Sequence, residues 1–338
     1  MSYRTAMARA LALIAVLLIS ATAQAQLFRS YLSGEGLDTN PCTLQLPCRL
    51  LPAALAAMVD GGEIWMVDSA NYNISQVNIT KSVTILAVPG ALGSVVATGG
   101  GNAIAIAAPG VKVTLRNLVI VHLNSSFNGV VFTQGAELNV VDCDIANMQT
   151  AGIYVSAPGS RVNVTRTQLR GSGTHGFYVT GTAVASLDGV NVRGNQYGVL
   201  VDTGAQVAFV NSVSAGNSHS GMWIQTSNGT GRVTIDNSVL TGNNYGVAIT
   251  TFAAGDVLRV AITRSTMSHN GAAGLATNKA AAGATHVTVL SDSTVVNNAT
   301  GIDFALNTPV IFTRGNNTVE FNSVADVAGG VLTAVPAK

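Results

Sequence analysis

Apolar and polar residues alternate in short runs along most of the chain, and glycine or asparagine separates the runs. In residues 198–217, Val199 and Val201 alternate with Leu200 and Asp202, and a second alternating run follows a bend at 203–205. Alternation of period two is typical of β-strands, and clusters of Gly and Asn are typical of turns. The unit therefore predicts three short strands joined by tight bends.

The same unit recurs at intervals of 22 to 28 residues. Its opening residues are Ala103, Gly129, Gly152, Gly176, Gly198, Gly221, Gly246, Gly274 and Gly301. A repeat of this length indicates a solenoid, and short strands select a parallel β-helix over helical repeats. One coil cannot bury its apolar face alone, so stacking at roughly 4.8 Å would build a continuous core.

Equivalent positions of successive coils carry equivalent residues when the repeats are overlaid. A small-residue column opens the third strand at Cys143, Thr167, Val190, Ser212, Ser238, Ser265 and Ser293. Further on, one turn position holds Asn195, Asn217, Asn243, Asn270 and Asn298. Buried asparagines at a turn can bond the backbone on both sides and stack into a ladder. We therefore expect a structural asparagine ladder along one edge of the solenoid.

The first 25 residues have the features of a cleavable signal peptide. Arg4 and Arg9 precede an apolar run at residues 10–19, and residues 23–25 form a small-x-small cleavage site. The apolar run is too short to span a bilayer, and no other segment of the sequence suits a membrane span. The sequence thus predicts a secreted or periplasmic protein. Cleavage leaves 15 basic and 16 acidic residues, which gives no support for nucleic-acid binding.

Residues 26–61 precede the regular coils. They begin with a candidate strand and continue into a loop in which Cys42 and Cys48 flank a short Pro-containing segment. In an exported chain this spacing predicts a disulfide, whereas Cys143 falls in the interior column as a buried thiol. Residues 50–59 have a helical apolar pattern, with Pro52 suited to the first turn. A helix here would cap the open end of the stack.

Two parts of the chain resemble known proteins. The coils of residues 62–325 resemble the right-handed parallel β-helix of the pectin-lyase-like superfamily. The leader, with Asn40-Pro41-Cys42-Thr43 and Pro47-Cys48-Arg49, is similar to the N-terminal segment of exported bacterial β-helix proteins. The resemblance implies an all-β, right-handed, single-stranded parallel β-helix with an N-terminal capping helix. Together with the N-terminal signal features, it divides the chain into a signal peptide (1–25), a capping region (26–61) and the β-helix (62–338).

The sequence shows none of the catalytic motifs of that superfamily. A glycoside hydrolase needs two carboxyl groups within about 5–9.5 Å, but Asp202 has no acidic neighbour within two coils of its face and Asp303 lies four coils away. Asp188 and Asp236 fall at a tight corner, where aspartate is a routine turn residue. The five histidines do not form a column, which argues against a metal site, and His175 is interpreted as a turn residue. No cofactor is indicated.

One outward column of the first strand is aromatic. Tyr154, Tyr178 and Trp223 share it, interrupted by Leu200, and Asp202 and Gln225 belong to the polar positions beside it. Such a strip is a plausible platform for a glycan chain. It would equally suit strand-favouring residues without a ligand, or a self-association surface.

The simplest prediction from the sequence is an exported, non-catalytic protein that binds an extracellular or envelope polysaccharide through this face. Two alternatives stay open at this point. One is a polysaccharide lyase or glycoside hydrolase with an unrecognised site. The other is a structural surface protein without a ligand. The bends are short for the deep groove of superfamily enzymes, which favours binding over catalysis.

Overall fold

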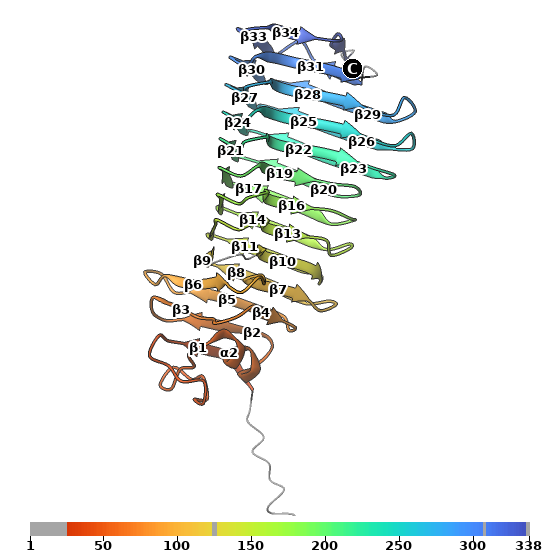
Figure 1. Ribbon diagram of the computed structural model, residues 1–338. Coiled ribbons are helices and arrows are strands. Elements are labelled where there is room, and N and C mark those ends of the chain that lie inside the picture. Colours follow the sequence, from red (N-terminus) through yellow and green to blue (C-terminus); the bar gives the residue numbers. More distant parts are fainter. Residues whose placement is uncertain (1–25, 124–126, 307–308, 336–338) are drawn as a thin grey trace, which may run out of the picture.

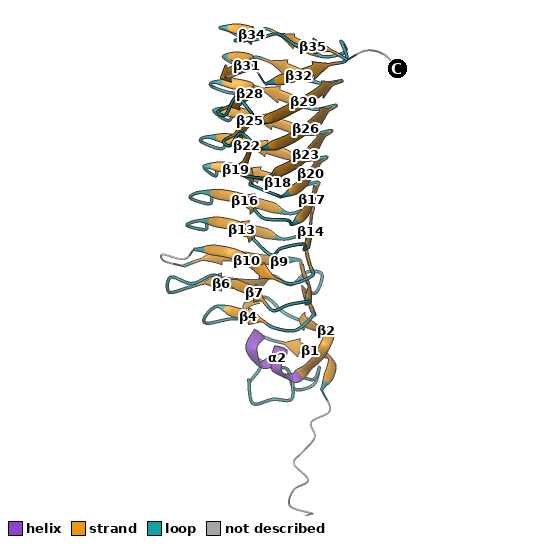
Figure 2. Ribbon diagram, turned by 90° about the vertical axis from the view of Figure 1, so that its right-hand side faces the viewer, coloured by secondary structure: helices purple, strands orange, loops and turns teal. Residues whose placement is uncertain are grey.

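The computed structural model of the protein describes residues 26–123, 127–306 and 309–335, so the predicted signal peptide lies outside the described residues. The chain winds into a stack of coils, with α2 near one end and β34 near the other (Figure 1). Each regular coil contributes one strand to each of three parallel sheets (Figure 2). The predicted all-β parallel solenoid is confirmed.

Sheet A follows the chain from one end of the stack to the other. Its strands, in spatial order, are β1 (Leu27–Leu32), β2 (Met58–Met66), β5 (Val83–Ala87), β8 (Lys112–Arg116), β11 (Glu137–Val141), β14 (Arg161–Thr165), β17 (Val184–Asp188), β20 (Gln206–Val210), β23 (Thr230–Asp236), β26 (Val257–Thr263), β29 (Thr285–Ser291), β32 (Val310–Thr313) and β35 (Thr333–Ala334).

Sheets B and C have eleven described strands each. Sheet B holds β3 (Ala70–Asn71), β6 (Gly93–Ala97), β9 (Leu118–His122), β12 (Asp144–Ala146), β15 (Gln168–Arg170), β18 (Asn191–Arg193), β21 (Val213–Ala215), β24 (Val239–Thr241), β27 (Thr266–Ser268), β30 (Thr294–Val296) and β33 (Thr318–Glu320). Sheet C holds β4 (Val77–Ile79), β7 (Ile104–Ala107), β10 (Asn128–Gln134), β13 (Ala151–Val155), β16 (His175–Val179), β19 (Tyr197–Val201), β22 (Ser220–Thr226), β25 (Tyr245–Thr251), β28 (Ala273–Lys279), β31 (Thr300–Leu306) and β34 (Ala325–Ala328).

The core is a column of aliphatic and aromatic side chains that point inward from all three sheets. On sheet C, Val130, Ile153, Phe177 and Val199 pair in register from coil to coil, and all four are fully buried. Because side chains alternate along a strand, this register sends the residues between them to the outer face. The outer face of sheet C is therefore set by the same alternation that fills the core.

Helix α2 (Leu51–Ala57) covers the N-terminal end of the stack, with Leu51, Ala54 and Leu55 buried. The helix is shorter than the predicted 50–59. It ends because Met58 adopts an extended conformation and starts β2, where it pairs with Leu27 of β1. Among the described residues, no helix has the length and apolar character needed to cross a membrane.

The five predicted asparagines bond to one another along the stack. The side-chain amide of each donates to Oδ1 of the next, at 3.1 Å from Asn195 to Asn217, 3.0 Å to Asn243, 3.2 Å to Asn270 and 2.9 Å to Asn298. The series also continues one coil further than the sequence predicts, from Asn298 to Asn322 at 3.0 Å. Each Oδ1 from Asn217 to Asn322 also accepts a hydrogen bond from the backbone amide of the asparagine one coil earlier, so these side chains satisfy backbone groups at the turn between sheets B and C.

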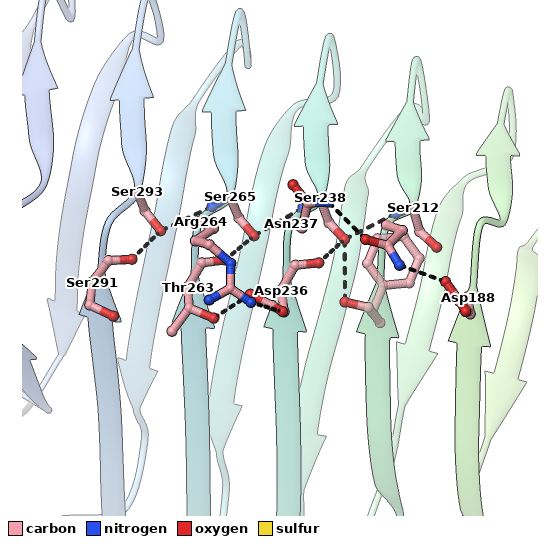
Figure 3. Close-up of polar contacts among 12 residues, drawn as sticks. Asp188, Ser212, Asp236, Asn237, Ser238, Thr263, Arg264, Ser265, Ser291 and Ser293 are labelled. Atoms are coloured by element: carbon pink, nitrogen blue, oxygen red, sulfur yellow. Dashed lines mark hydrogen bonds and ion pairs between the residues drawn. The ribbon is translucent and has the colours of Figure 1, made fainter.

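A second ladder occupies the corner between sheets A and B (Figure 3). The backbone amides of Ser212, Ser238 and Ser265 each donate to the hydroxyl of the serine one coil on, at 3.2 Å in every case. On the outside of the corner, Asp236 accepts hydrogen bonds from Thr263 and Arg264 (Figure 3). These contacts give the carboxyl groups of this corner a structural role.

The coils lengthen toward the C-terminal end at the turn between sheets C and A. The added residues lengthen the strands, since β22 continues to Thr226 and β23 begins at Thr230. On sheet C, β19 has five residues, whereas β22 in the next coil has seven. The late coils therefore project further at this edge (Figure 1).

Candidate functional site

The predicted outward column lies on sheet C. Tyr154 pairs with Tyr178, Tyr178 with Leu200, and Leu200 with Trp223 on four successive strands. The three aromatic side chains are partly exposed, whereas Leu200 is only 6% exposed. In the central column alone, the aromatic surface would be broken at Leu200.

Tyr197 fills this break from the start of β19. Its ring centroid lies 4.9 Å from Trp223 and 5.5 Å from His175. His175 in turn lies 4.9 Å from Tyr178, which lies 5.1 Å from Tyr154. The rings on either side of Leu200 are therefore connected through neighbouring strand positions.

The contacts continue in the other direction through His219. Its ring stacks on Trp223 at a centroid distance of 5.4 Å and lies 5.5 Å from Tyr245. We call the connected set the aromatic track. It comprises Tyr154, His175, Tyr178, Tyr197, His219, Trp223 and Tyr245, from five successive coils.

Three of these residues share a register position that the alternation of apolar and polar residues does not reveal. His175, Tyr197, Ser220 and Tyr245 pair in succession at the first position of their strands. The interpretation of His175 as a turn residue was wrong, because it begins β16 and is 9% exposed. The sequence signal was an aromatic ring directly before the opening glycine of a coil, at Gly176, Gly198 and Gly246.

Burial shifts the pKa values of several rings of the track. Burial lowers the pKa of His175 to about 4 and also lowers the pKa of His219. Burial, followed by the charge of Asp202, raises the pKa of Tyr178 to about 12. The phenol of Tyr178 and both imidazoles are therefore neutral groups, suited to contacts with other neutral groups.

Asp202 and Gln225, the two polar candidates, have different environments. The Tyr178 hydroxyl donates to Oδ2 of Asp202 at 3.1 Å, and the backbone amide and hydroxyl of Thr203 donate to Oδ1 at 2.7 and 3.1 Å. These bonds hold the carboxylate beside the track. Gln225 lies on β22, paired with Thr250, and is partly exposed.

A pocket of about 210 Å³ adjoins the C-terminal end of the track. His219, Trp223 and Tyr245 form its aromatic side, and Asn278 and Asp303 contribute polar groups from β28 and β31. Oδ1 of Asn278 is buried there without a hydrogen-bond partner among the described residues. A buried acceptor of this kind is costly unless a donor reaches it.

A larger hollow of about 550 Å³ lies on the outer face of sheet A. Its outward residues include small or aliphatic side chains, such as Ala208, Ala261 and Val289, with Arg232 and Arg259 as its charged groups. It contains no aromatic ring. We therefore regard the smaller pocket, which continues the aromatic track, as the better candidate.

The other predicted chemistry has simple structural explanations. Cys42 and Cys48 form the expected disulfide. Cys143 is a buried free thiol whose pKa is raised to about 12, mainly by burial. Within the described ranges, no group of three or more His, Cys, Asp or Glu residues is arranged to hold a metal ion.

The carboxyl groups on this face are too far apart for glycoside hydrolysis by a carboxylate pair. Asp202 follows β19 and Asp303 lies on β31, four strands further along sheet C. Four strand spacings correspond to roughly 19 Å, whereas paired glycosidase carboxyls lie about 5–9.5 Å apart. The two acids therefore flank the track as separate groups.

Comparison with known proteins supports the architecture. A family model described as the right-handed β-helix region matches residues 62–255 and 175–334. No curated protein sequence matches the chain.

Solved structures share the fold at low sequence identity. Pectate lyase Pel9A has a TM-score of 0.61 and 15% identity, over 89% of this chain and 78% of that protein. The A-module of the mannuronan C-5 epimerase AlgE4 from Azotobacter vinelandii has a TM-score of 0.60 and 13% identity, over 82% and 91%. Tailspike protein 2 of an Escherichia coli O157:H7 bacteriophage has a TM-score of 0.54 and 12% identity, over 82% and 44%. At these identities the likeness shows the fold alone.

Proposed function

Given that the chain belongs to the right-handed β-helix family, we propose that it binds a polysaccharide along the aromatic track of sheet C and does not act on it chemically. The observation that carries the proposal is the continuity of the track. Seven rings from five successive coils contact one another in sequence, including across the position of Leu200.

An aromatic row suits a chain-like ligand with alternating apolar and polar edges. Sugar rings present C–H faces that pack on aromatic rings and hydroxyl edges that hydrogen-bond to neighbouring polar groups. Five coils at a spacing of about 4.8 Å extend over roughly 19 Å, which is longer than one sugar ring. Asp202 and Gln225 lie beside the row as hydrogen-bonding groups for such hydroxyls.

The ionisation of the track argues for binding over catalysis. A general acid or base works best when its pKa lies near the working pH. Burial instead moves the pKa of His175 down to about 4 and that of Tyr178 up to about 12. The lyases and epimerases of this fold make an enzyme the second candidate, but burial moves the pKa values of His175 and Tyr178 away from neutral pH.

The proposed setting is outside the cytoplasm. The predicted signal peptide at residues 1–25 supports export, and the Cys42–Cys48 disulfide is typical of an oxidising compartment. An extracellular or envelope polysaccharide would be accessible there.

Affinity electrophoresis and glycan arrays with the purified protein test the proposal. We expect binding to at least one polysaccharide, and a loss of roughly tenfold or more in Trp223→Ala, because that side chain contacts both Tyr197 and His219. Trp65→Ala is the matched control, since Trp65 packs under Arg29 on sheet A, away from the track. Equal binding by Trp223→Ala and the unmodified protein would overturn the proposal.

The self-association interpretation predicts a different result for the same pair of variants. Sedimentation would then show a dimer that dissociates in Trp223→Ala and persists in Trp65→Ala, with no glycan binding in either.

A further inference from the structure

Positive charge is unevenly distributed around the coils. From β8 to β33, the described arginines and lysines of sheets A and B and of the corner between them are Lys112, Arg116, Arg161, Arg166, Arg170, Arg193, Arg232, Arg259, Arg264 and Arg314. Over the same coils, sheet C and the described parts of its two flanking turns contain a single residue of this kind, Lys279.

Lys279 stands apart from the track. It ends β28 at the position that pairs with Thr251, which is fully buried and so lies on the inward side of its strand. Its charge helps to lower the pKa of the buried His286 on sheet A, after the larger effect of burial. The charge of Lys279 therefore acts toward the solenoid interior at the turn between sheets C and A.

The charged groups beside the track are acidic. Asp202 lies next to Tyr178, and Asp303 lines the pocket that Trp223 and Tyr245 also line. Both are acidic side chains, and no arginine or lysine of the described residues lies on the outward face of sheet C beside them. Such a face repels an anionic polymer. The carboxylates of that polymer would find no ionic partners on it.

The pocket also favours a ligand group that donates a hydrogen bond over a ligand group that only accepts one. The Oδ1 atom of Asn278 is buried without a partner among the described residues, and the carboxyl group of Asp303 offers acceptor oxygens as well. A sugar hydroxyl can donate to either group. The carboxylate of a uronate sugar would place acceptor against acceptor.

On these grounds, and resting on the proposed function, we infer that the polysaccharide bound along the track is uncharged, and that polyuronates are excluded from this face. Aromatic stacking and hydroxyl hydrogen bonds supply the affinity without ionic contacts. Binding at this site should therefore depend little on ionic strength, in contrast to binding of a polyanion by arginine and lysine.

The test compares ligand classes on the full chain by affinity electrophoresis and titration calorimetry. The probes are a neutral β-glucan, a neutral galactomannan, polygalacturonate, alginate and the cationic chitosan, each at low and high ionic strength. Only binding that Trp223→Ala weakens is attributed to the aromatic track and called track-dependent, because the arginines of sheets A and B can hold a polyanion elsewhere. We expect track-dependent binding of a neutral polymer, with an affinity that changes less than about twofold between low and high salt.

A charge-insertion variant provides a gain-of-function test. Ala276 lies in the outward column between Ala248 and Asp303 and lines the pocket. In Ala276→Arg, polyuronate binding should increase by about tenfold at low ionic strength and disappear at high ionic strength. No gain in a folded variant would contradict the assigned role of charge.

The outcomes separate this inference from the proposed function. Track-dependent binding of polyuronates or chitosan alone would overturn the inference and leave polysaccharide binding by the track in place. Failure of every glycan to bind would overturn both.

Discussion

The ring of Tyr197 lies 4.9 Å from the ring of Trp223 and connects two aromatic groups that the central column of sheet C leaves apart at Leu200. Tyr197 also contacts His175 and His219. The function of the track as one continuous surface therefore depends on this side chain more than on either end.

Tyr197→Leu should weaken polysaccharide binding without unfolding the protein. Aromatic pairs contribute about 0.5–1.5 kcal/mol beyond their buried area, so we expect an affinity loss of roughly 3- to 10-fold. Titration calorimetry measures it. Tyr31→Leu is the matched control, because Tyr31 contacts Trp65 on sheet A. An affinity unchanged in Tyr197→Leu would show that the track does not act as a continuous surface.

Loss of the disulfide should affect the N-terminal cap and leave ligand binding intact. Cys42 and Cys48 close a loop with a sequence separation of six residues, and the chain-entropy model gives about 2–3 kcal/mol for a loop of this length. Cys48→Ser should expose the amides of residues 27–50 to faster hydrogen exchange. Glycan affinity should stay unchanged, since the track begins at Tyr154; a parallel fall in affinity would contradict this separation.

The fold could be predicted because its determinants repeat. Asn195 and its equivalents recur at one turn position, and each has only to bond its counterpart in the next coil. The continuation to Asn322 was missed because the apolar pattern weakens after Pro309. The helix was predicted too long because Met58 fits a helical apolar face as well as it fits the first position of β2.

The site was only partly predictable. Period-two alternation identifies the middle of a strand, so Tyr154, Tyr178 and Trp223 could be placed in one outward column. Tyr197 and His175 occupy the strand start next to a glycine, where a sequence pattern does not say on which side the ring lies. Their contacts depend on side-chain directions that only the three-dimensional arrangement defines.

The thiol of Cys143 should be unreactive in the native protein. Its pKa is raised to about 12 and its side chain is buried, so the reactive thiolate is scarce and inaccessible at pH 8. A colorimetric thiol reagent should label no cysteine in the native protein and one per chain in denaturant. Rapid labelling of the native protein would show that the corner between sheets A and B opens readily.

Asn243→Ala should destabilise the solenoid from its middle. The Asn243 amide donates to the Ser214 carbonyl and to Asn270, and its Oδ1 accepts from the backbone and side-chain amides of Asn217. Unsatisfied buried groups cost about 1–3 kcal/mol each, so we expect a loss of roughly 3 kcal/mol in urea unfolding. The neighbouring, exposed Asn244→Ala is the control and should change stability by less than about 0.5 kcal/mol.

Stability should fall in mild acid because of buried histidines. Burial, assisted by Lys279, lowers the pKa of His286 to about 4, and burial alone lowers that of His175 to about 4. An unfolded histidine has a pKa of about 6.5, so between these values the unfolded state binds more protons than the native state. The stability contributed by the neutral rings is therefore present above about pH 6.5 and is lost as pH falls toward 4.

His286→Gln should reduce this pH dependence. The free energies of unfolding from urea titrations at pH 7.5 and about pH 4.5 should differ less in the variant than in the unmodified protein, by an amount on the order of 1–3 kcal/mol. Part of the dependence should remain, because His175 is unchanged. His269→Asn serves as the control, since His269 is exposed and its backbone φ of 54° suits asparagine. If stability changed as much between pH 7.5 and about pH 4.5 in His286→Gln as in the unmodified protein, the His286 ring would be protonated in the native state at the lower pH.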